Sequence, residues 1–431
     1  MALERAGVPV VFVCTDAFVP LAEAVAGQQG FPELPRVELP HPIGGRDPGE
    51  LRVTAKSLGG AVAAALCTAP GRTSESAEVA EVAEMPDDPG AFTAAVGARG
   101  WGDGLPLLVP SVERVEDFLA ASGIDPATVI GPVPPEDRLA DARTLAANAL
   151  MAGCDPMHLP VVVAALVAML ESPFNLEALQ TTTHPVTPLV VVHGAAVDRL
   201  GFNAGPNTYG QGTRANAATG RAVRLVLQHV GGARPGATDR ATHGTPAKYS
   251  ACIAELADAV PWPSLAAARG VDAPEGAVTV IGCEGPHNVN DHGSDDADGL
   301  IGTIAGTLAS LGSNNLYLRG QPLLVLSPEH AELCVRAGLD RQQVGAAVRA
   351  RARVPVSAIS PGNLTRFKRI NPGLFDPPPG DGLIPMLDAD EDLLICVAGG
   401  PGKHSMIVPT FGTTDAVTVS IADAVARAAA G

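Results

Sequence analysis

Short, continuous apolar runs that alternate with helix-like segments constrain the fold of this chain more than any other feature of its sequence. The clearest runs are VPVVFV at 8–13, LVVVH at 189–193 and AVTVIGC at 277–283. An uninterrupted run of this length is typical of a strand buried on both faces, as in a sheet covered by helices. We therefore expect an α/β protein, with a small open α/β domain at the N-terminus and a larger mixed α/β domain after it.

Periodicity and capping residues place the remaining elements. Asp16 and Asp47 stand where N-caps are expected, each just before a helix-like segment. Further strands are expected at 36–39, 322–327, 393–399, 406–411 and 416–421. Helices are expected at 17–28, 47–67, 111–122, 135–153, 159–172, 215–230, 246–259, 299–311, 330–338 and 340–352 and at the C-terminus.

The 431 residues suffice for two to three domains at ~150 residues each. Residues 69–90 are acidic and lack periodicity, which favours a boundary in this part of the chain. We therefore expect a small domain at 1–75, a linker at 76–95 and a larger domain at 96–431, with a subdivision near residue 320.

The net charge and the cysteines limit which binding partners and which cellular compartment we expect. The net charge is −17 and aromatic residues are 3% of the chain, so nucleic acid and anionic membrane are not expected partners. The seven cysteines are odd in number and form no CxxC pair, which favours a reducing, cytoplasmic location. The longest apolar run, 160–170, is about half a membrane span. We further expect a homo-oligomer.

A glycine-rich loop at 201–213 leads into the helix expected at 215–230. Backbone N–H groups and the positive end of a helix dipole make such a junction an anion site. Six bases and one acid lie between 205 and 250, so positive charge is concentrated here. Arg214 is the best candidate because its guanidinium binds carboxylate or phosphate through two N–H groups; a solvated surface helix is the alternative. The expected substrate-binding residues are Asn203, Tyr209, Gly212, Arg214, Asn216 and Arg221.

A second group of candidates follows the strand expected at 277–283. Cys283, Glu284 and His287 bring a thiol, a carboxylate and an imidazole within five residues, which suits a nucleophile, an acid/base and an orienting group. Ligands of open α/β sheets lie beyond strand ends of this kind. His287 and His292 also suggest a divalent metal, although their spacing matches no standard zinc signature. The alternative is that Cys283 is a buried apolar residue.

Several other residues are catalytic candidates on local pattern alone. Lys248 and Glu255 would share a face of the helix expected at 246–259, and a solvent-facing ion pair is the alternative. His184, in Thr-Thr-Thr-His-Pro, is either a base or a structural turn residue. Cys154 lies in an Ala-Gly-Cys-Asp-Pro turn. Cys14-Thr15-Asp16 ends the first strand and could face a crevice.

Residues 2–45, ALERAGVPVVFVCTDAFVPLAEAVAGQQGFPELPRVELPHPIGG, resemble the UGSC family, which is named for a Sec/Cys-Gly-Ser-Cys motif and is similar to the selenoprotein B component of glycine reductase. The rest of the chain resembles a large bacterial region often joined to that family. The segments that carry this second resemblance are Trp101–Pro106, Met151–Cys154, Thr183–Pro185, Arg214–Asn216, Gly231–Gly236, Lys248-Tyr249, Ala254-Glu255 and Pro286–Val289.

The family motif precedes the segment that matches Ala2 to Gly7, and none of the seven cysteines occupies its position. Three explanations stay open: the redox pair has been lost, a separate small chain that carries the motif supplies it, or the assigned start codon is too late. The resemblance implies thiol redox chemistry without assigning it to a residue of this chain.

These observations favour a cytosolic enzyme that acts on a small carboxylate or phosphate. The resemblance implies a lyase-like reaction or a reductive cleavage that a thiol could assist. A metal-dependent hydrolase or lyase using His287 and His292 is one alternative, and a non-catalytic subunit of a thiol or selenol redox complex is another. No cofactor is assigned. The favoured hypothesis requires the arginines after Tyr209 to converge on a pocket shared with residues 283–287.

Overall fold

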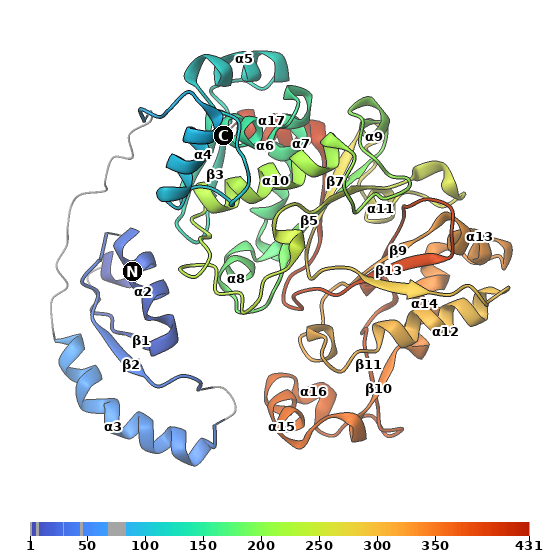
Figure 1. Ribbon diagram of the computed structural model, residues 1–431. Coiled ribbons are helices and arrows are strands. Elements are labelled where there is room, and N and C mark those ends of the chain that lie inside the picture. Colours follow the sequence, from blue (N-terminus) through green and yellow to red (C-terminus); the bar gives the residue numbers. More distant parts are fainter. Residues whose placement is uncertain (1, 6–7, 29, 44–45, 68–82, 431) are drawn as a thin grey trace.

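The computed structural model describes the whole chain except residues 1, 6–7, 29, 44–45, 68–82 and 431. Helices and several small sheets alternate along the chain, so the expected α/β class is confirmed. Figure 1 shows a small N-terminal region, which we define as residues 2–67, beside a larger body formed by residues 83–430. Part of the expected linker, 76–82, lies outside the described residues.

The N-terminal region is built on two parallel strands. β1 (Phe12–Thr15) pairs with β2 (Arg36–Leu39), with Thr15 opposite Leu39. Asp47 caps the longest helix by accepting from the N–H groups of Gly49 and Glu50, as its position in the sequence predicts. The first strand begins four residues later than its apolar run. The helices and 3-10 turn are α1 (Ala2–Arg5), η1 (Asp16–Phe18), α2 (Val19–Gln28) and α3 (Pro48–Leu66).

Apolar helices form the first layer of the larger body. Every residue of α7 (Leu159–Met169) except Pro160 is buried, because this helix lies between α6 (Ala142–Ala152), α10 (Arg214–His229) and a sheet. α5 (Val112–Ser122) packs against α6, and α17 (Ile421–Ala430) packs against α7. The other elements of this part are α4 (Pro89–Ala98), β3 (Val129–Val133), β4 (Arg138–Asp141), α8 (Leu176–Thr181) and α9 (Ala196–Arg199). α4 occupies part of the expected linker.

The first large sheet has the strand order β14-β7-β5-β6. Its centre is the antiparallel pair β5 (Thr187–His193) and β7 (Ala277–Cys283), both completely buried. β6 (Cys252–Ala254) extends one side in parallel, and β14 (Val417–Ser420) closes the other. The register sets Thr187 opposite Cys283, so the start of β5 and the end of β7 lie at the same edge.

The second large sheet has the order β12-β9-β13-β8. Its strands are β8 (His287–Asn290), β9 (Leu323–Leu326), β12 (Leu394–Val397) and β13 (His404–Val408). Its helices and side hairpin are α11 (Leu265–Ala268), α12 (Ala297–Leu308), α13 (Pro328–Arg336), α14 (Arg341–Arg351), α15 (Pro361–Ile370), α16 (Pro372–Phe375), β10 (Arg353–Pro355) and β11 (Leu383–Pro385). The chain enters this sheet at β8, before residue 320, and returns to the first sheet at β14. The expected domain boundaries therefore stay predictions.

The prediction of a helix at 246–259 is wrong. This segment forms a 3-10 turn, η4 (Pro246–Lys248), then β6 and a second 3-10 turn, η5 (Ala257–Ala259). Pairing with β5 gives Cys252, Ile253 and Ala254 a buried strand position, and this tertiary contact outweighs the helix propensity of the alanines.

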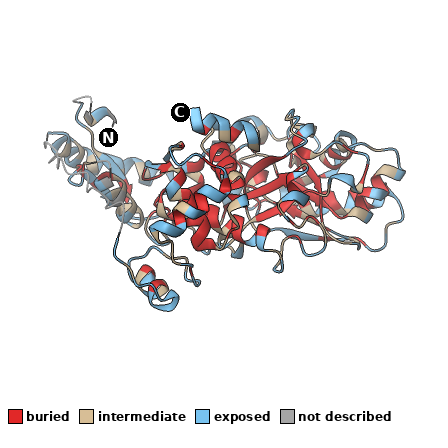
Figure 2. Cartoon of the chain, turned by 90° about the horizontal axis from the view of Figure 1, so that it is seen from above, coloured by how far each residue is buried: buried red, intermediate tan, exposed pale blue. Residues whose placement is uncertain are grey.

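Burial differs sharply between the two parts, as Figure 2 shows: the larger body has a continuous buried interior, whereas the N-terminal region is mostly exposed or intermediate. Within the described ranges, no single helix has the length and apolar character to cross a membrane. One pair of segments meets that test only when joined, Pro156–Met169 with Ser172–Thr181, and it is bent by 78°.

Candidate functional site

The arginines after Tyr209 do not converge on the 283–287 turn, which corrects the central expectation. Arg214 donates to the carbonyls of Gly153 and Cys154 at 2.7 and 2.9 Å. Arg221 forms a two-pronged ion pair with Asp103 at 2.7 and 2.9 Å. Each of these two guanidinium groups finds its hydrogen-bond partners close to its own position on α10. Their positive charges therefore do not meet at one site.

The glycine-rich loop is held mainly by its own hydrogen bonds. Asn203 and Asn216 exchange two of them, at 2.8 and 2.9 Å, and so fix the loop on the start of α10. Gly212, at φ +117°, makes the last bend before the helix. Tyr209 is directed into the apolar interior, where its hydroxyl has no partner among the described residues and burial raises its pKa.

Arg214 retains a setting that suits the predicted anion site. It lines a hollow of about 300 Å³ at the start of α10, together with Ala215, Arg199, His158 and Asp155. The carboxylate of Asp155 lies 4.0 Å from the Arg214 guanidinium and offsets part of its charge. Substrate binding at Arg214 therefore stays a prediction.

The two thiol candidates in the body are core residues. Cys154 and Cys283 are each 2% exposed. Burial raises the pKa of the Cys154 thiol to about 12 and that of the Cys283 thiol further, and the neighbouring Glu284 carboxylate acts in the same direction on Cys283. Because the thiolate is the reactive form, this burial favours the structural alternative for both side chains.

Lys248 and Glu255 do not share a helix face, because no helix forms there. Lys248 binds both carboxylate oxygens of Asp239 at 2.7 and 2.8 Å. Glu255 follows β6 and contacts His193 at 2.7 Å and Arg341 at 3.3 Å. Burial would raise the pKa of Glu255, but the hydrogen bond with His193 and the nearby positive charges hold it below its ordinary value. The two residues belong to separate polar clusters.

Two candidates from distant parts of the sequence do meet. His184 Nε2 lies 2.8 Å from Glu284 Oε1, although 100 residues separate them. They meet because His184 precedes β5, Glu284 follows β7, and the antiparallel register brings these two points to one sheet edge. Asn314 Nδ2 lies 3.0 Å from His184 Nδ1 and completes the row. We call Asn314, His184 and Glu284 the relay.

The contacts of the relay fix the proton positions. The Asn314 amide donates to His184 Nδ1, so Nε2 carries the imidazole proton and donates it to Glu284. Phe411 stacks on the imidazole with ring centroids 5.8 Å apart. The side chain of His184 is 13% exposed and that of Glu284 is 28% exposed. The carboxylate is therefore more accessible than the imidazole, and the ring behind it is held in one orientation.

Residues 236–248 pack beside the relay and carry a surplus of positive charge. Thr242 N donates to the carbonyl of Thr183 at 2.9 Å. A Cβ at Gly285 would lie only 3.1 Å from Thr245 Oγ1, so this turn approaches closely. Asp239 is shared by Lys248 and by Arg224, at 2.7 and 3.0 Å.

Arg240 connects this segment to the N-terminal region. Its guanidinium donates to the main-chain carbonyls of Gly236 and Ala17, each at 2.7 Å, and its central carbon, Cζ, lies 5.9 Å from the centroid of the Phe18 ring. We call residues 236–248, together with Asp16–Phe18, the seam. Both of these hydrogen-bond partners of Arg240 are neutral carbonyls.

His287 and His292 do not form a pair. Successive residues of a strand point to opposite faces, so His287 and Asn288 face opposite ways at the start of β8, and His292 lies two residues beyond the end of that strand. In the part of the chain that the structure describes, no group of three or more His, Cys, Asp and Glu side chains has metal-binding geometry.

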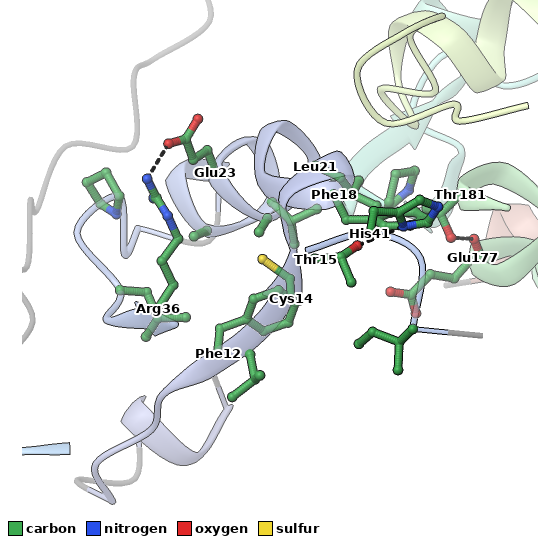
Figure 3. A pocket seen from close by; sticks show the side chains of 18 residues that line it. Phe12, Cys14, Thr15, Phe18, Leu21, Glu23, Arg36, His41, Glu177 and Thr181 are labelled. Atoms are coloured by element: carbon green, nitrogen blue, oxygen red, sulfur yellow. Dashed lines mark hydrogen bonds and ion pairs between the residues drawn. The ribbon is translucent and has the colours of Figure 1, made fainter. Parts of the chain in front are cut away.

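A pocket of about 630 Å³ lies between the two parts, along β1 and beside the turn that follows β2 (Figure 3). Cys14, Thr15 and His41 line it from the N-terminal region, and Glu177 and Thr181 of α8 line it from the body. Thr15 Oγ1 lies 3.1 Å from His41 Nδ1. Burial, together with the Glu38 carboxylate, raises the pKa of the Cys14 thiol. Cys14 and Thr15, two of the three residues expected to face a crevice, thus line this pocket.

The comparison with protein families identifies the N-terminal part of the chain. Residues 1–68 match the model of the UGSC family, so the UGSC-like character expected for this region is confirmed. No curated protein and no solved structure matches the chain.

Sequence reasoning missed Asn314, Asp239 and His41. Asn314 stands in a Ser-Asn-Asn turn with no motif around it, and Asp239 is the lone acid of a basic segment. That isolation was an available signal for Asp239, because a single carboxylate among arginines is a natural counter-ion. Nothing local marks Asn314 or His41.

Proposed function

We propose that the protein is an enzyme that removes a proton from a small anionic substrate at the relay, in a reaction of the lyase type. The observation that carries this proposal is the 2.8 Å contact between His184 and Glu284, backed by Asn314. A base that is oriented by a second group, which is itself held by a third, is the arrangement that general acid–base catalysis requires.

Glu284 is the proton acceptor in this proposal. Its carboxylate takes a proton from the carbon next to the substrate carboxylate or phosphate ester. The electron pair left behind forms a double bond and expels the group on the adjacent carbon, which leaves with its own bonding pair. His184 holds the carboxylate in place through its Nε2 proton, and Asn314 fixes the tautomer.

Positive charge around residues 236–248 supports an anionic substrate. Arg240, Lys248 and the neighbouring Arg224 of α10 carry three positive charges, and Asp239 and Asp16 carry two negative ones. Since Thr242 contacts Thr183 directly before the relay, this charge lies close to the proposed base. A substrate carboxylate or phosphate balances it.

Burial of the thiols favours this reaction over thiol-assisted cleavage within the body, because Cys154 and Cys283 are protonated and enclosed. The cytoplasmic location, the homo-oligomer and the small partner chain carrying a Sec/Cys-Gly-Ser-Cys motif stay predictions.

Proton exchange in D₂O tests the proposal with simple acids as probes. Lactate, malate and 2-phosphoglycerate are incubated with the protein, and ¹H NMR measures loss of the C–H signal next to the acid group. We expect Glu284→Gln to slow the exchange by about 10²-fold or more and Glu332→Gln, on an exposed part of α13, to leave it unchanged. Absence of exchange on all three probes, or exchange in Glu284→Gln at the wild-type rate, contradicts the proposal.

A further inference from the structure

Two exposed imidazoles converge at the edge of the second large sheet, away from the relay. His292 follows the end of β8 and His404 begins β13. Their Nε2 atoms lie 3.1 Å apart, with the rings edge to face at 73° and their centroids 4.9 Å apart. The two histidines are separated by 112 residues, so the sheet creates their proximity.

A neighbouring amide fixes the tautomer of His404. Asn288 and His404 lie on one face of the β8–β13 ladder, because Asn288 pairs with Met406 and Asn290 pairs with His404. His404 Nδ1 lies 3.0 Å from Asn288 Oδ1, an oxygen that only accepts, so Nδ1 carries the ring proton. His404 Nε2 then directs its lone pair toward His292. This is the hydrogen-bonding pattern that accompanies metal-ligating histidines.

Buried hydrogen bonds hold the backbone on both sides of the pair. His330, which is fully buried, lies 2.7 Å from the hydroxyl of Ser405 and 3.1 Å from the carbonyl of Asp291, the residues next to His404 and His292. Asp291 in turn accepts from Ser294 N at 2.9 Å and from the hydroxyl of Thr303 at 2.7 Å. The backbone that carries the two imidazoles is therefore held in place by hydrogen bonds on both sides of the pair.

We propose that His292 and His404 form a binding site for one borderline divalent transition-metal ion, of the zinc or copper type. Zinc–nitrogen distances are about 2.0–2.1 Å. Two nitrogens on one ion with roughly tetrahedral or square-planar angles are then about 3 Å apart, which agrees with the 3.1 Å separation. Imidazole nitrogen suits zinc, copper and nickel, whereas magnesium and calcium require oxygen ligands.

The charges around the pair allow this ion. Lys403 directs its ammonium group to the carbonyls of His292 and Ser294, at 3.3 and 3.1 Å, and lies 4.0 Å from the carboxylate of Asp295, which offsets its charge. Two protein ligands leave the other coordination positions to water or to a group of a bound molecule. The site is independent of the relay, since it shares no residue with it.

Zinc titration of chelator-stripped, full-length protein tests the site by calorimetry. We expect one equivalent of Zn²⁺ to bind the wild type and His287→Ala equally, because His287 faces the other side of the strand. The double variant His292→Ala/His404→Ala is expected to bind at least tenfold more weakly, and Asn288→Ala to lose affinity in the same direction. All four positions are exposed, so circular dichroism should show an unchanged fold.

An independent readout identifies the ligands. Substitution of Cu²⁺ should give an electron paramagnetic resonance spectrum with coupling to imidazole nitrogen, and the double variant should lose this coupling. A loss of Zn²⁺ affinity smaller than tenfold in the double variant, or nitrogen coupling that persists in it, overturns the proposal and leaves the pair as hydrogen-bonded imidazoles. Glu284→Gln should keep full Zn²⁺ binding, so failure of this site and failure of the proposed reaction are distinguishable.

Discussion

The N-terminal region and the larger body use the same local pattern of strands and helices, yet they bury very different amounts of apolar surface. The buried cluster of the N-terminal region contains Ala26, Phe31 and Leu34, whereas a single cluster of the body extends from Phe92 to Ala428. In β1, Phe12 and Val13 remain 41% and 47% exposed, although strand residues of the body such as Val190 are fully buried.

This difference teaches that an α/β pattern specifies elements but not a stable core. A two-stranded sheet has too little area to offset the entropy of ordering the chain around it. The N-terminal region gains part of its order from the seam, where Arg240 binds Ala17, and from the walls of the shared pocket. The body supplies its own stability.

The largest effect should come from the core of the body. Phe174 is completely buried, so Phe174→Ala removes its contacts and leaves a cavity; we expect a loss of about 3–5 kcal/mol in the free energy of unfolding. Urea titration with tryptophan fluorescence measures it, because both tryptophans, Trp101 and Trp262, lie in the body.

Phe31→Ala is the matched substitution in the N-terminal region. It should leave the tryptophan transition in place and increase proteolysis within residues 2–67. A shift of the tryptophan transition by more than about 1 kcal/mol would show that the two parts unfold as one unit and would remove the basis of the comparison.

Acid should weaken the body through a histidine of α10. His229 Nε2 is shielded without a partner in the described structure, and burial lowers the pKa of His229 to about 4 from its ordinary value of 6.5. As the pH falls, His229 becomes protonated near pH 6.5 in the unfolded chain but only near pH 4 in the folded chain. Stability is therefore highest above pH 6.5 and falls between these values, by up to about 3 kcal/mol.

Urea titrations at pH 7 and pH 4.5 check this expectation. His229→Gln, which keeps an amide donor for the Asn148 oxygen that lies 2.6 Å from His229 Nδ1, should flatten the decline. An equal decline in wild type and variant would assign the acid sensitivity to other groups.

The smallest effect sharpens the comparison at the seam itself. Arg240→Ala removes the hydrogen bond to the Ala17 carbonyl and the contact with the Phe18 ring; the expected loss is about 1–2 kcal/mol in local stability. Amide hydrogen exchange over residues 12–18 should accelerate about tenfold, while the tryptophan transition stays unchanged. Arg52→Ala, on an exposed part of α3, is the control and should leave both measurements as in the wild type.

The sequence predicts elements well where local pattern and burial agree. β7 occupies its apolar run from Ala277 to Cys283, and β2 lies where it was expected at 36–39. The prediction fails at 246–259, because pairing of β6 with β5 is a contact between distant segments that no local pattern encodes.

The candidate site follows the same rule. Sequence chemistry identified His184 and Glu284 separately, each from the residues around it. Only the antiparallel register of β5 and β7 shows that they belong together. The expected convergence of arginines was wrong because the charge count could not reveal their partners, such as Asp103 and the carbonyls of residues 153 and 154.

The last strand of the chain has a consequence for biosynthesis. β14, at Val417–Ser420, pairs with β7, at Ala277–Val280, so an outer border of the first sheet is supplied by residues made some 140 positions later. During translation from the N-terminus, β7 keeps one side unpaired until residues 417–420 have emerged from the ribosome. Truncation before residue 417 would therefore leave an open strand edge available for association between nascent chains.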